Sequence, residues 1–143
     1  MLRPAIEGLA CGLGLGGECD SLAYSHDVPF PMGAVNACAM SSAWEGMPNV
    51  LLETSATSLP VVATDVGGNR EVAFHEKTEF LAPPKDLHAL AQAMLHLMSL
   101  PQEERKHMGE RARRYVEENF SLERVVDRWE RLYREHLLKK SVL

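Results

Sequence analysis

The chain has 143 residues, enough for one domain with its own core, and its composition is that of an ordinary soluble globular protein. Its formal net charge is −5, from 15 basic and 20 acidic residues, which argues against nucleic acid as the main partner because that role calls for a basic excess. Three cysteines without paired spacing argue against a disulfide framework or a zinc site and favour a reduced, cytoplasmic setting. No apolar run reaches the roughly 20 residues that span a bilayer.

The first part of the chain carries the weakest pattern. Residues 4–15 predict a short helix that is ended by its glycines. Residues 12–17 match the spacing G-x-G-x-x-G, but no strand leads into them and no helix follows, so a helix-ending loop is favoured over a dinucleotide site. Residues 22–24 and 37–40 predict short strands, and prolines between them leave room only for a short helix near residues 32–35.

From Ser41 onward the pattern sharpens into strands that alternate with helices. Pro48 suits the first turn of a helix, which we expect to run to about Ser58. Residues 59–64 form a β-branched run typical of a strand buried on both faces, and residues 80–82 predict another strand. This alternation predicts an α/β fold, with a Rossmann-like parallel sheet and flanking helices.

Three helices are predicted to form a helical C-terminal tail, beginning at Asp86, near Pro101 and after Ser121. The last of them carries an apolar stripe that includes Trp129 and Tyr133. Packing of this stripe against the domain is the ordinary interpretation. A stripe left exposed would instead drive association with another molecule.

The strongest candidate site combines two glutamates with the turn between them. Glu45 follows a predicted strand, and Glu53 lies about five residues into the next helix, or roughly 7 Å along its axis. Ligands of open α/β sheets bind beyond the carboxyl ends of the strands, and helix N-termini offer free N–H groups to phosphates. The turn could therefore cradle a diphosphate while a carboxylate on each side accepts hydrogen bonds from sugar and ribose hydroxyls.

The residues around this pair resemble a known family. The string SSAWEGMPNVLLETSATSLPVVATDVGGNREV, residues 41–72, is similar to the signature region of glycosyltransferase family 4, whose members have the two-domain GT-B architecture. The similarity covers roughly residues 27–138. It implies that residues 41–143 are a nucleotide-sugar-binding domain with C-terminal helices, and that residues 1–40 are its poorly matching N-terminal part.

The resemblance also implies roles for individual residues. The first glutamate of the family motif, here Glu45, contacts the hydroxyls of the donor sugar and is the catalytic candidate, whereas the second, here Glu53, contacts the ribose diol. Donor-binding backbone groups are implied for the turn and the helix start between them, at Gly46, Met47, Pro48, Asn49 and Val50. No metal or other cofactor is expected, because the chain has no Asp-x-Asp motif and the helix terminus can take the phosphate charge.

The sequence departs from the family pattern at several positions. Ser58 and Glu79 stand where the family usually has glycine, and a non-glycine residue is strained wherever the backbone needs a positive φ. Asn36 stands where the family often has aspartate, and the usual Leu-Gly turn is not visible around residues 24–26. We expect these changes to affect local stability and base recognition more than the glutamate pair.

The resemblance implies a retaining glycosyltransferase that uses a UDP- or GDP-sugar and transfers a hexosyl group to a glycan or lipid acceptor, as in polysaccharide biosynthesis. The family's glycine-rich turn, its phosphate-neutralising Arg and Lys, and its acceptor-binding first domain are not found before Arg3. We therefore expect a chain truncated at its N-terminus that lacks activity alone, because diphosphate charges without cationic partners lose binding energy. The expected partners are a nucleotide-diphosphate sugar and either a missing N-terminal acceptor domain or a second copy of the chain. Peripheral membrane contact is compatible with a lipid acceptor.

Two alternatives remain open at this stage. The chain could be a non-catalytic nucleotide-sugar-binding or interaction fragment. Titration with nucleotides distinguishes the two cases, because a working donor site binds a nucleotide and an inert fragment does not. It could also belong to another nucleotide-sugar enzyme of the same architecture, such as an epimerase, although the catalytic groups for that reaction are not found.

Overall fold

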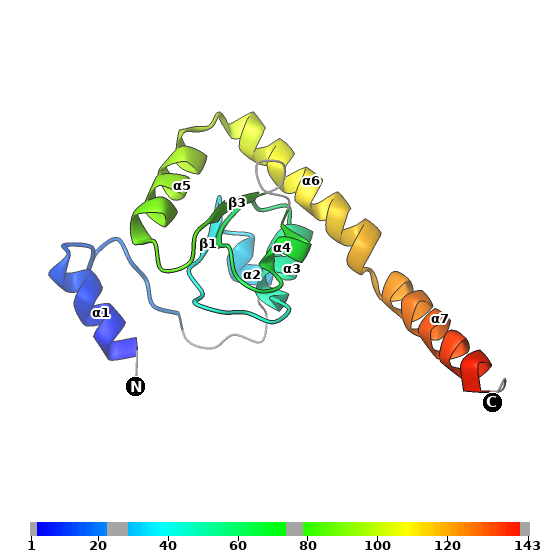
Figure 1. Ribbon diagram of the computed structural model, residues 1–143. Helices are drawn as coiled ribbons and strands as arrows, with labels where there is room; N and C mark the ends of the chain where they lie inside the picture. The colour runs from blue at the N-terminus through cyan, green and yellow to red at the C-terminus, as the bar shows by residue number, and fades with distance from the viewer. Residues whose placement is uncertain (1–2, 23–28, 74–78, 141–143) are drawn as a thin grey trace.

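The computed structural model describes residues 3–22, 29–73 and 79–140, and its centre is a parallel three-stranded sheet (Figure 1). The strand order is β1 (Cys38–Met40), β2 (Val61–Thr64), β3 (Glu79–Ala82). In the register of the sheet, Val61 lies opposite Cys38 on one side and Glu79 on the other. The predicted α/β class and its parallel sheet are confirmed.

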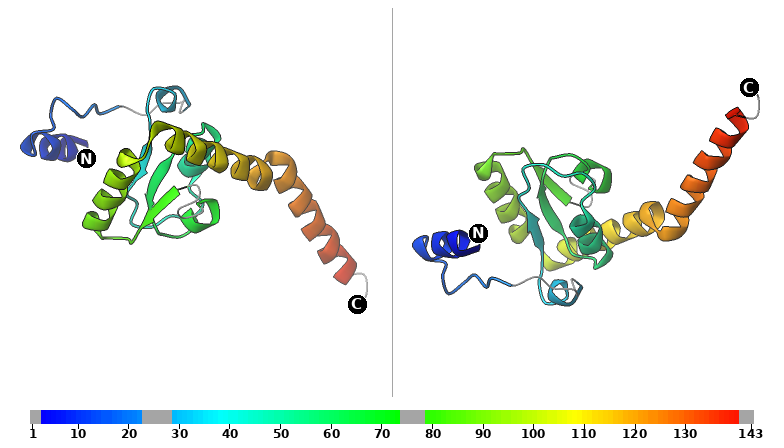
Figure 2. Two further views of the ribbon diagram at one scale, coloured as in Figure 1. Left: turned by 90° about the horizontal axis from the view of Figure 1, so that it is seen from above. Right: turned by 90° about the horizontal axis from the view of Figure 1, so that it is seen from below.

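Helices cover both faces of this sheet (Figure 2). The helices of the described residues, in chain order, are α1 (Arg3–Gly12), α2 (Pro29–Met32), α3 (Asn49–Ala56), α4 (Asn69–Val72), α5 (Leu87–Ser99), α6 (Gln102–Phe120) and α7 (Leu122–Lys140). Helix α5 packs on β2 and β3 from one side, whereas α3 covers the other side and packs along α6. The predicted cap is present, since the Asp86 carboxylate accepts from the Ala89 N–H at 2.9 Å.

Strand β2 forms the middle of the core because all of its side chains are buried. Val61 and Ala63 pack with Leu51 of α3 on one face of the sheet. On the opposite face, Val62 packs with Leu97 of α5 and Met108 of α6. This alternation is the period of a strand buried on both faces, as the sequence predicted for this segment.

Ser58, one of the departures from the family pattern, forms the turn between α3 and β2 in a left-handed conformation with φ 60°. The backbone there is one that glycine adopts without strain, so the serine carries a local cost of roughly 1 kcal/mol. Helix α6 passes close by, because a Cβ on Gly109 would lie 1.8 Å from the Ser58 carbonyl oxygen. A glycine is therefore required on α6 at this crossing.

Glu79, the other departure, lowers stability because its carboxyl group is buried, not because its backbone is strained. It adopts an ordinary strand conformation at the start of β3, so the backbone there does not need a positive φ and the residue is not strained. Its side chain is fully buried, and the Ser55 hydroxyl of α3 donates to its Oε1 at 3.1 Å. The other carboxylate oxygen has no partner within the described ranges. Burial raises the pKa of Glu79 to about 7, although the bond from Ser55 partly opposes this shift.

The pKa of Glu79 makes the stability of the fold depend on pH. Below pH 4.5, the ordinary value, the carboxyl is protonated in both states and the folded protein carries no penalty; as the pH rises toward about 7, only the unfolded chain ionises and stability falls. The total loss is roughly 3 kcal/mol. We expect Glu79→Gln to remove most of this loss, as measured by urea denaturation between pH 5 and pH 8. Glu118→Gln, at an exposed position, is the control. If the free energy of unfolding of Glu79→Gln falls with pH as steeply as that of the wild type, the buried carboxyl is not the cause of the pH dependence.

The two ends of the chain extend away from the sheet (Figures 1 and 2). Helix α1 ends at Gly12, and Gly14 follows with φ 78°, which confirms the helix-ending loop. A short strand was predicted at residues 22–24, but Leu22 does not lie in a strand. Residues 23 and 24 lie outside the described ranges. On α7 the apolar stripe is exposed, with Trp129 at 53% and Tyr133 at 60%, so the expected packing against the domain is wrong.

Candidate functional site at the carboxyl edge of the sheet

The predicted site lies where β1 and β2 end, and a chain of hydrogen bonds joins the two ends. The Thr64 hydroxyl, at the end of β2, donates to the Ser42 carbonyl oxygen at 2.6 Å. The Ser42 hydroxyl in turn donates to Oε1 of Glu45 at 2.7 Å. Glu45 is half-buried, so this bond fixes the direction of a carboxylate that still reaches the surface. The neighbouring Trp44 is 84% exposed.

Two glycines let the loop after β2 touch the turn after β1. A Cβ on Gly67 would lie 1.8 Å from the Glu45 carbonyl oxygen, and a Cβ on Gly68 would lie 2.1 Å from that of Gly46. In place of side chains there is a backbone hydrogen bond, from the Gly68 N–H to the Gly46 carbonyl at 2.9 Å. Gly67 also has φ 45°, a conformation that suits glycine. The loop after β2 therefore sets the position of the turn that holds Glu45.

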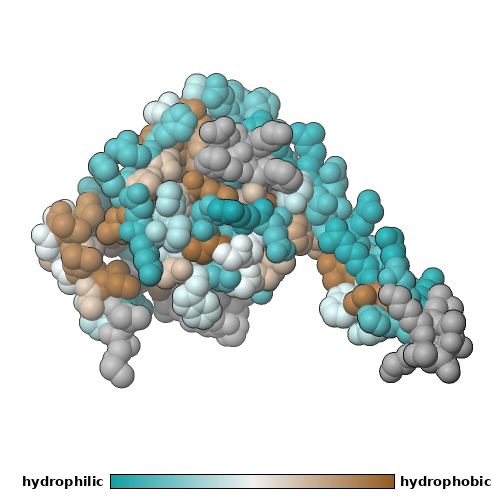
Figure 3. Space-filling model, in the orientation of Figure 1, coloured by the Kyte–Doolittle hydropathy of each residue, from teal (hydrophilic) through white to brown (hydrophobic). Residues whose placement is uncertain are grey.

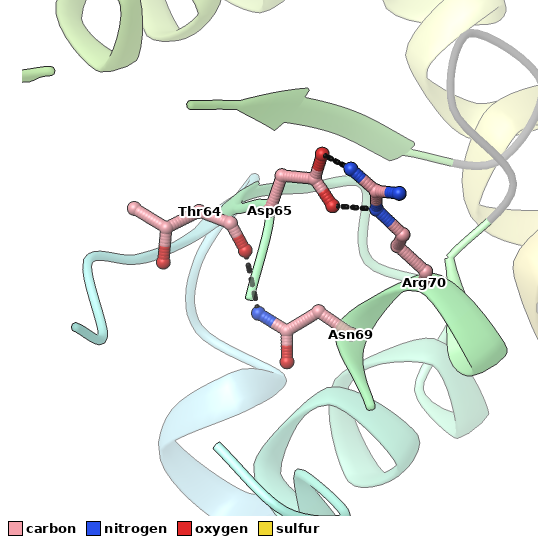
Figure 4. Close-up of polar contacts among 4 residues, drawn as sticks. All are labelled: Thr64, Asp65, Asn69 and Arg70. Atoms are coloured by element: carbon pink, nitrogen blue, oxygen red, sulfur yellow. Dashed lines mark hydrogen bonds and ion pairs between the residues drawn. The ribbon is translucent and has the colours of Figure 1, made fainter. Parts of the chain in front are cut away.

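Side chains of the short helix α4 hold this loop in place (Figure 4). The buried side chain of Asn69 donates through Nδ2 to the Thr64 carbonyl at 2.7 Å. Next to it, Arg70 forms a bidentate ion pair with Asp65, the first residue after β2. A hollow of about 350 Å³ adjoins this pair at the ends of β2 and β3, lined by Asp65, Arg70, Ala73, Leu81 and Pro83.

Helix α3 begins at this edge of the sheet without a side-chain cap. Pro48 precedes the helix, and its carbonyl accepts from the Leu51 and Leu52 N–H groups. The earlier N–H groups, of Asn49 and Val50, come before the first bonds inside the helix and are the donors that a helix N-terminus offers to an anion. Because α3 buries Leu51, Thr54 and Ser55, its opposite side faces outward.

The structure places the predicted site residues in the turn after β1 and on helix α3. Glu45 and Gly46 lie in the turn that touches the glycine loop, Met47 is exposed, and Pro48 is buried at the helix start. Asn49, Val50 and Glu53 are exposed on α3. Glu53 follows Asn49 by four residues, so the two share one side of the helix, about 6 Å apart along its axis.

Sequence reasoning missed the side chains that support this site. Ser42, Thr64 and Asn69 act through hydrogen bonds between segments that are 3 to 22 residues apart in the chain. Serine, threonine and asparagine next to strand ends are common turn residues, and nothing in their spacing marks them as partners. Among the described residues, no group of three or more His, Cys, Asp or Glu side chains is arranged to hold a metal ion. That part of the chain also has no helix long and apolar enough to cross a membrane.

Comparison with known proteins identifies the family. The model of the family "Glycosyl transferases group 1" matches residues 5–115, and the chain belongs to this family. The parallel sheet, its flanking helices and the helical tail correspond to the C-terminal domain of a GT-B glycosyltransferase.

Two bacterial relatives show how much of each chain is matched. The N-acetyl-alpha-D-glucosaminyl L-malate synthase of Bacillus anthracis is 38% identical over 84 residues, which cover 59% of this chain and 22% of that protein. The UDP-Gal:alpha-D-GlcNAc-diphosphoundecaprenol alpha-1,3-galactosyltransferase of Escherichia coli is 25% identical over 119 residues, which cover 83% of this chain and 30% of that protein.

Solved structures share the fold. The sucrose-phosphate synthase of Thermosynechococcus elongatus matches with a TM-score of 0.85 and 29% identity, over 96% of this chain and 35% of that one. Alr3699/HepE of Anabaena, in complex with UDP, matches with a TM-score of 0.86 and 21% identity, over 93% of this chain and 36% of that one. The present chain thus spans 22% to 36% of the length of these four proteins.

Because the two turns approach closely, alanine in place of glycine should destabilise the fold at Gly68 but not at Gly46. Gly68→Ala places a methyl group 2.1 Å from a backbone oxygen, at a residue whose φ of −70° suits alanine, so its cost is purely steric. We expect a loss of about 2–3 kcal/mol in the free energy of unfolding, measured by chemical denaturation. Gly46→Ala is the matched control, because a Cβ there meets nothing within 4 Å. Equal stability of the two variants would contradict the close approach.

Proposed function

We propose that this chain is the donor-binding part of a retaining glycosyltransferase of family 4, which takes a hexosyl group from a UDP- or GDP-sugar and passes it to a glycan or lipid acceptor. The observation that carries the proposal is the uncapped start of α3, reached from the turn that contains Glu45 and followed by Glu53 on the exposed side of the helix. Support comes from the named UDP-Gal donor of the Escherichia coli relative and the UDP bound to the Anabaena protein.

The start of α3 is the proposed diphosphate site. Anions are stabilised at a helix N-terminus by free N–H groups and by the positive end of the helix dipole. The N–H groups of Asn49 and Val50 would donate to the phosphate oxygens. As the bond between the sugar carbon and the diphosphate breaks, negative charge grows on the leaving oxygen, and preorganised donors stabilise that charge without having to reorient.

The two glutamates are proposed to hold the sugar and the nucleoside on either side of the diphosphate. Ser42 occupies Oε1 of Glu45, which leaves Oε2 to accept from a hydroxyl of the donor sugar. Ser42 is thus a positioning residue, and Glu45 is the proposed catalytic residue because it would touch the reacting sugar. Glu53, on the exposed side of α3, would accept from the two ribose hydroxyls.

Separate roles for the two glutamates predict different binding profiles. We expect Glu53→Ala to weaken UDP and UDP-glucose alike, by about 10-fold or more, because each loses hydrogen bonds to a charged acceptor. Glu45→Ala should weaken UDP-glucose but leave UDP nearly unchanged, since UDP has no sugar to hold. Isothermal titration of the full chain measures both, with GDP and ADP forms testing the base. Glu118→Ala on α6 is the control, and identical profiles for the two site variants would refute the separate roles.

We also propose that the 143-residue chain does not catalyse transfer by itself. Residues 41–60, which form the turn and α3, contain no Lys or Arg to neutralise the diphosphate, and the chain spans only part of the length of its relatives. The chain would then act as a non-catalytic nucleotide-sugar-binding fragment until a partner supplies the missing groups.

Radiolabelled UDP-glucose and UDP-galactose, each offered with lipid and oligosaccharide acceptors, test this point. We expect no labelled product from the purified chain, while titration still detects nucleotide binding. Transfer above the rate without protein, lost in Glu45→Ala, would show that the chain is a complete enzyme.

A further inference from the structure

The turn that holds Glu45 exposes apolar side chains before and after this carboxylate in the chain. Trp44 is 84% exposed, the highest value among the large apolar side chains of the described residues. Met47 and Val50, which follow Glu45 toward the start of α3, are 47% and 48% exposed. Aromatic side chains bury more apolar area in a contact than other residues do, so a tryptophan at this edge of the sheet is well suited to contact a ligand.

Trp44 belongs to the same fixed turn as the carboxylate that would hold the donor sugar. The Cα atoms of Trp44 and Glu45 lie about 3.8 Å apart, because the two residues are consecutive. The Ser42 hydroxyl donates to Glu45, and the Thr64 hydroxyl donates to the Ser42 carbonyl, so the turn is tied to the end of β2. The indole is thereby anchored at the same edge of the sheet as the carboxylate.

A hexose ring in its chair form offers two kinds of surface. Its hydroxyls project mainly from the rim and suit a carboxylate acceptor, whereas the C–H groups on its faces are apolar. The face of an indole carries negative charge density, which attracts the slightly positive hydrogens of C–H groups. Glu45 and Trp44 therefore supply the two kinds of contact that one hexose needs.

The same segment provides no cation for an acidic sugar. Both glutamates of the site are acceptors with negative charge, and the indole face is negative as well. Residues 41–69, which run from the turn through α3 and β2 to the glycine loop, contain no Lys or Arg. Arg70, the next residue, already forms a bidentate ion pair with Asp65. A carboxylate on the sugar would thus meet like charge at Glu45, which disfavours its binding.

We propose that Trp44 stacks on the hexosyl ring of the donor, and that Trp44 and Glu45 together select a neutral hexose over a hexuronic acid. The inference rests on the donor site proposed above and adds to it a sugar-contacting residue and a class of sugar. Stacking fixes the plane of the ring, and the bond to Glu45 fixes the rotation of the ring within that plane. The two contacts together hold the anomeric carbon in one orientation.

Fluorescence tests whether the sugar covers the indole. The chain contains two tryptophans, so Trp129→Phe leaves Trp44 as the single fluorescent indole. In this variant, UDP-glucose should lower the acrylamide quenching of Trp44 by about 2-fold, because a stacked ring covers one face of the indole. UDP should leave the quenching unchanged, since it has no sugar. Equal protection by UDP and UDP-glucose would mean that the nucleotide covers Trp44, and the proposal would be wrong.

Isothermal titration of the full chain measures the contribution of the stack. We expect Trp44→Ala to raise the dissociation constant of UDP-glucose by about 10-fold and to leave that of UDP unchanged. Trp44→Phe should retain most of the affinity, because phenylalanine keeps an aromatic face. Trp129→Ala is the matched control and should change neither constant, since Trp129 lies on α7. Figure 3 shows that this arm stands apart from the rest of the molecule.

UDP-glucuronic acid tests the preference for a neutral sugar, because it differs from UDP-glucose only by a carboxylate in place of the hydroxymethyl group. We expect the wild type to bind it about 10-fold more weakly than UDP-glucose, and Glu45→Gln to narrow this difference. Equal affinity of the wild type for the two donors, or an affinity for UDP-glucose that Trp44→Ala does not change, would overturn the inference while UDP binding leaves the donor site standing. A chain that binds none of these nucleotides would overturn the donor site and the inference together.

Discussion

Gly67 and Gly68 bring the loop after β2 so close to the turn after β1 that a methyl group on either residue would overlap a carbonyl oxygen. The rest of the site depends on this contact. It fixes the turn from Glu45 to Pro48, and that turn sets the direction in which α3 leaves the sheet. The hydrogen bonds from Thr64 to Ser42 and from Ser42 to Glu45 act across the same junction. The helix start is thereby held by backbone contacts, and the carboxylate is held by the short side chain of Ser42.

Two departures from the family pattern lie at the opposite edge of the sheet from this junction, where β2 and β3 begin. Ser58 occupies a left-handed turn at the far end of α3, and Glu79 is buried beneath the same helix against Ser55. Both cost stability while leaving the exposed side of α3 unchanged. Helix α3 therefore packs on two residues that lower the stability of the fold, and the loss at Glu79 grows as the pH rises toward about 7.

Membership of the glycosyl transferases group 1 family and the limited span of the chain have a joint consequence. The fold supplies the carboxyl edge of a GT-B C-terminal domain, including the helix start and both glutamates. The matched part of this chain covers only 22% to 35% of the length of these relatives. Nucleotide binding is therefore proposed for this chain on the strength of that edge of the sheet.

The sequence by itself determined the order of the elements and the family. Residues 59–64 gave a buried strand because β-branched side chains suit both faces of a sheet, and Pro48 marked the start of α3 because its ring fits a first helical turn. The motif from Ser41 to Val72 identified the glutamate pair. These features are local, so the chain encodes them within a few residues.

Only the tertiary structure decided how distant segments meet. It showed that Ser42, Thr64 and Asn69 tie the site together, that Glu79 is buried without full hydrogen bonding, and that the stripe on α7 is exposed. The stripe was expected to pack against the domain, since an amphipathic helix looks the same in sequence whether its apolar side is covered by its own chain or by another molecule. Burial and hydrogen bonding between segments depend on where the chain returns in space, which periodicity along the sequence does not specify.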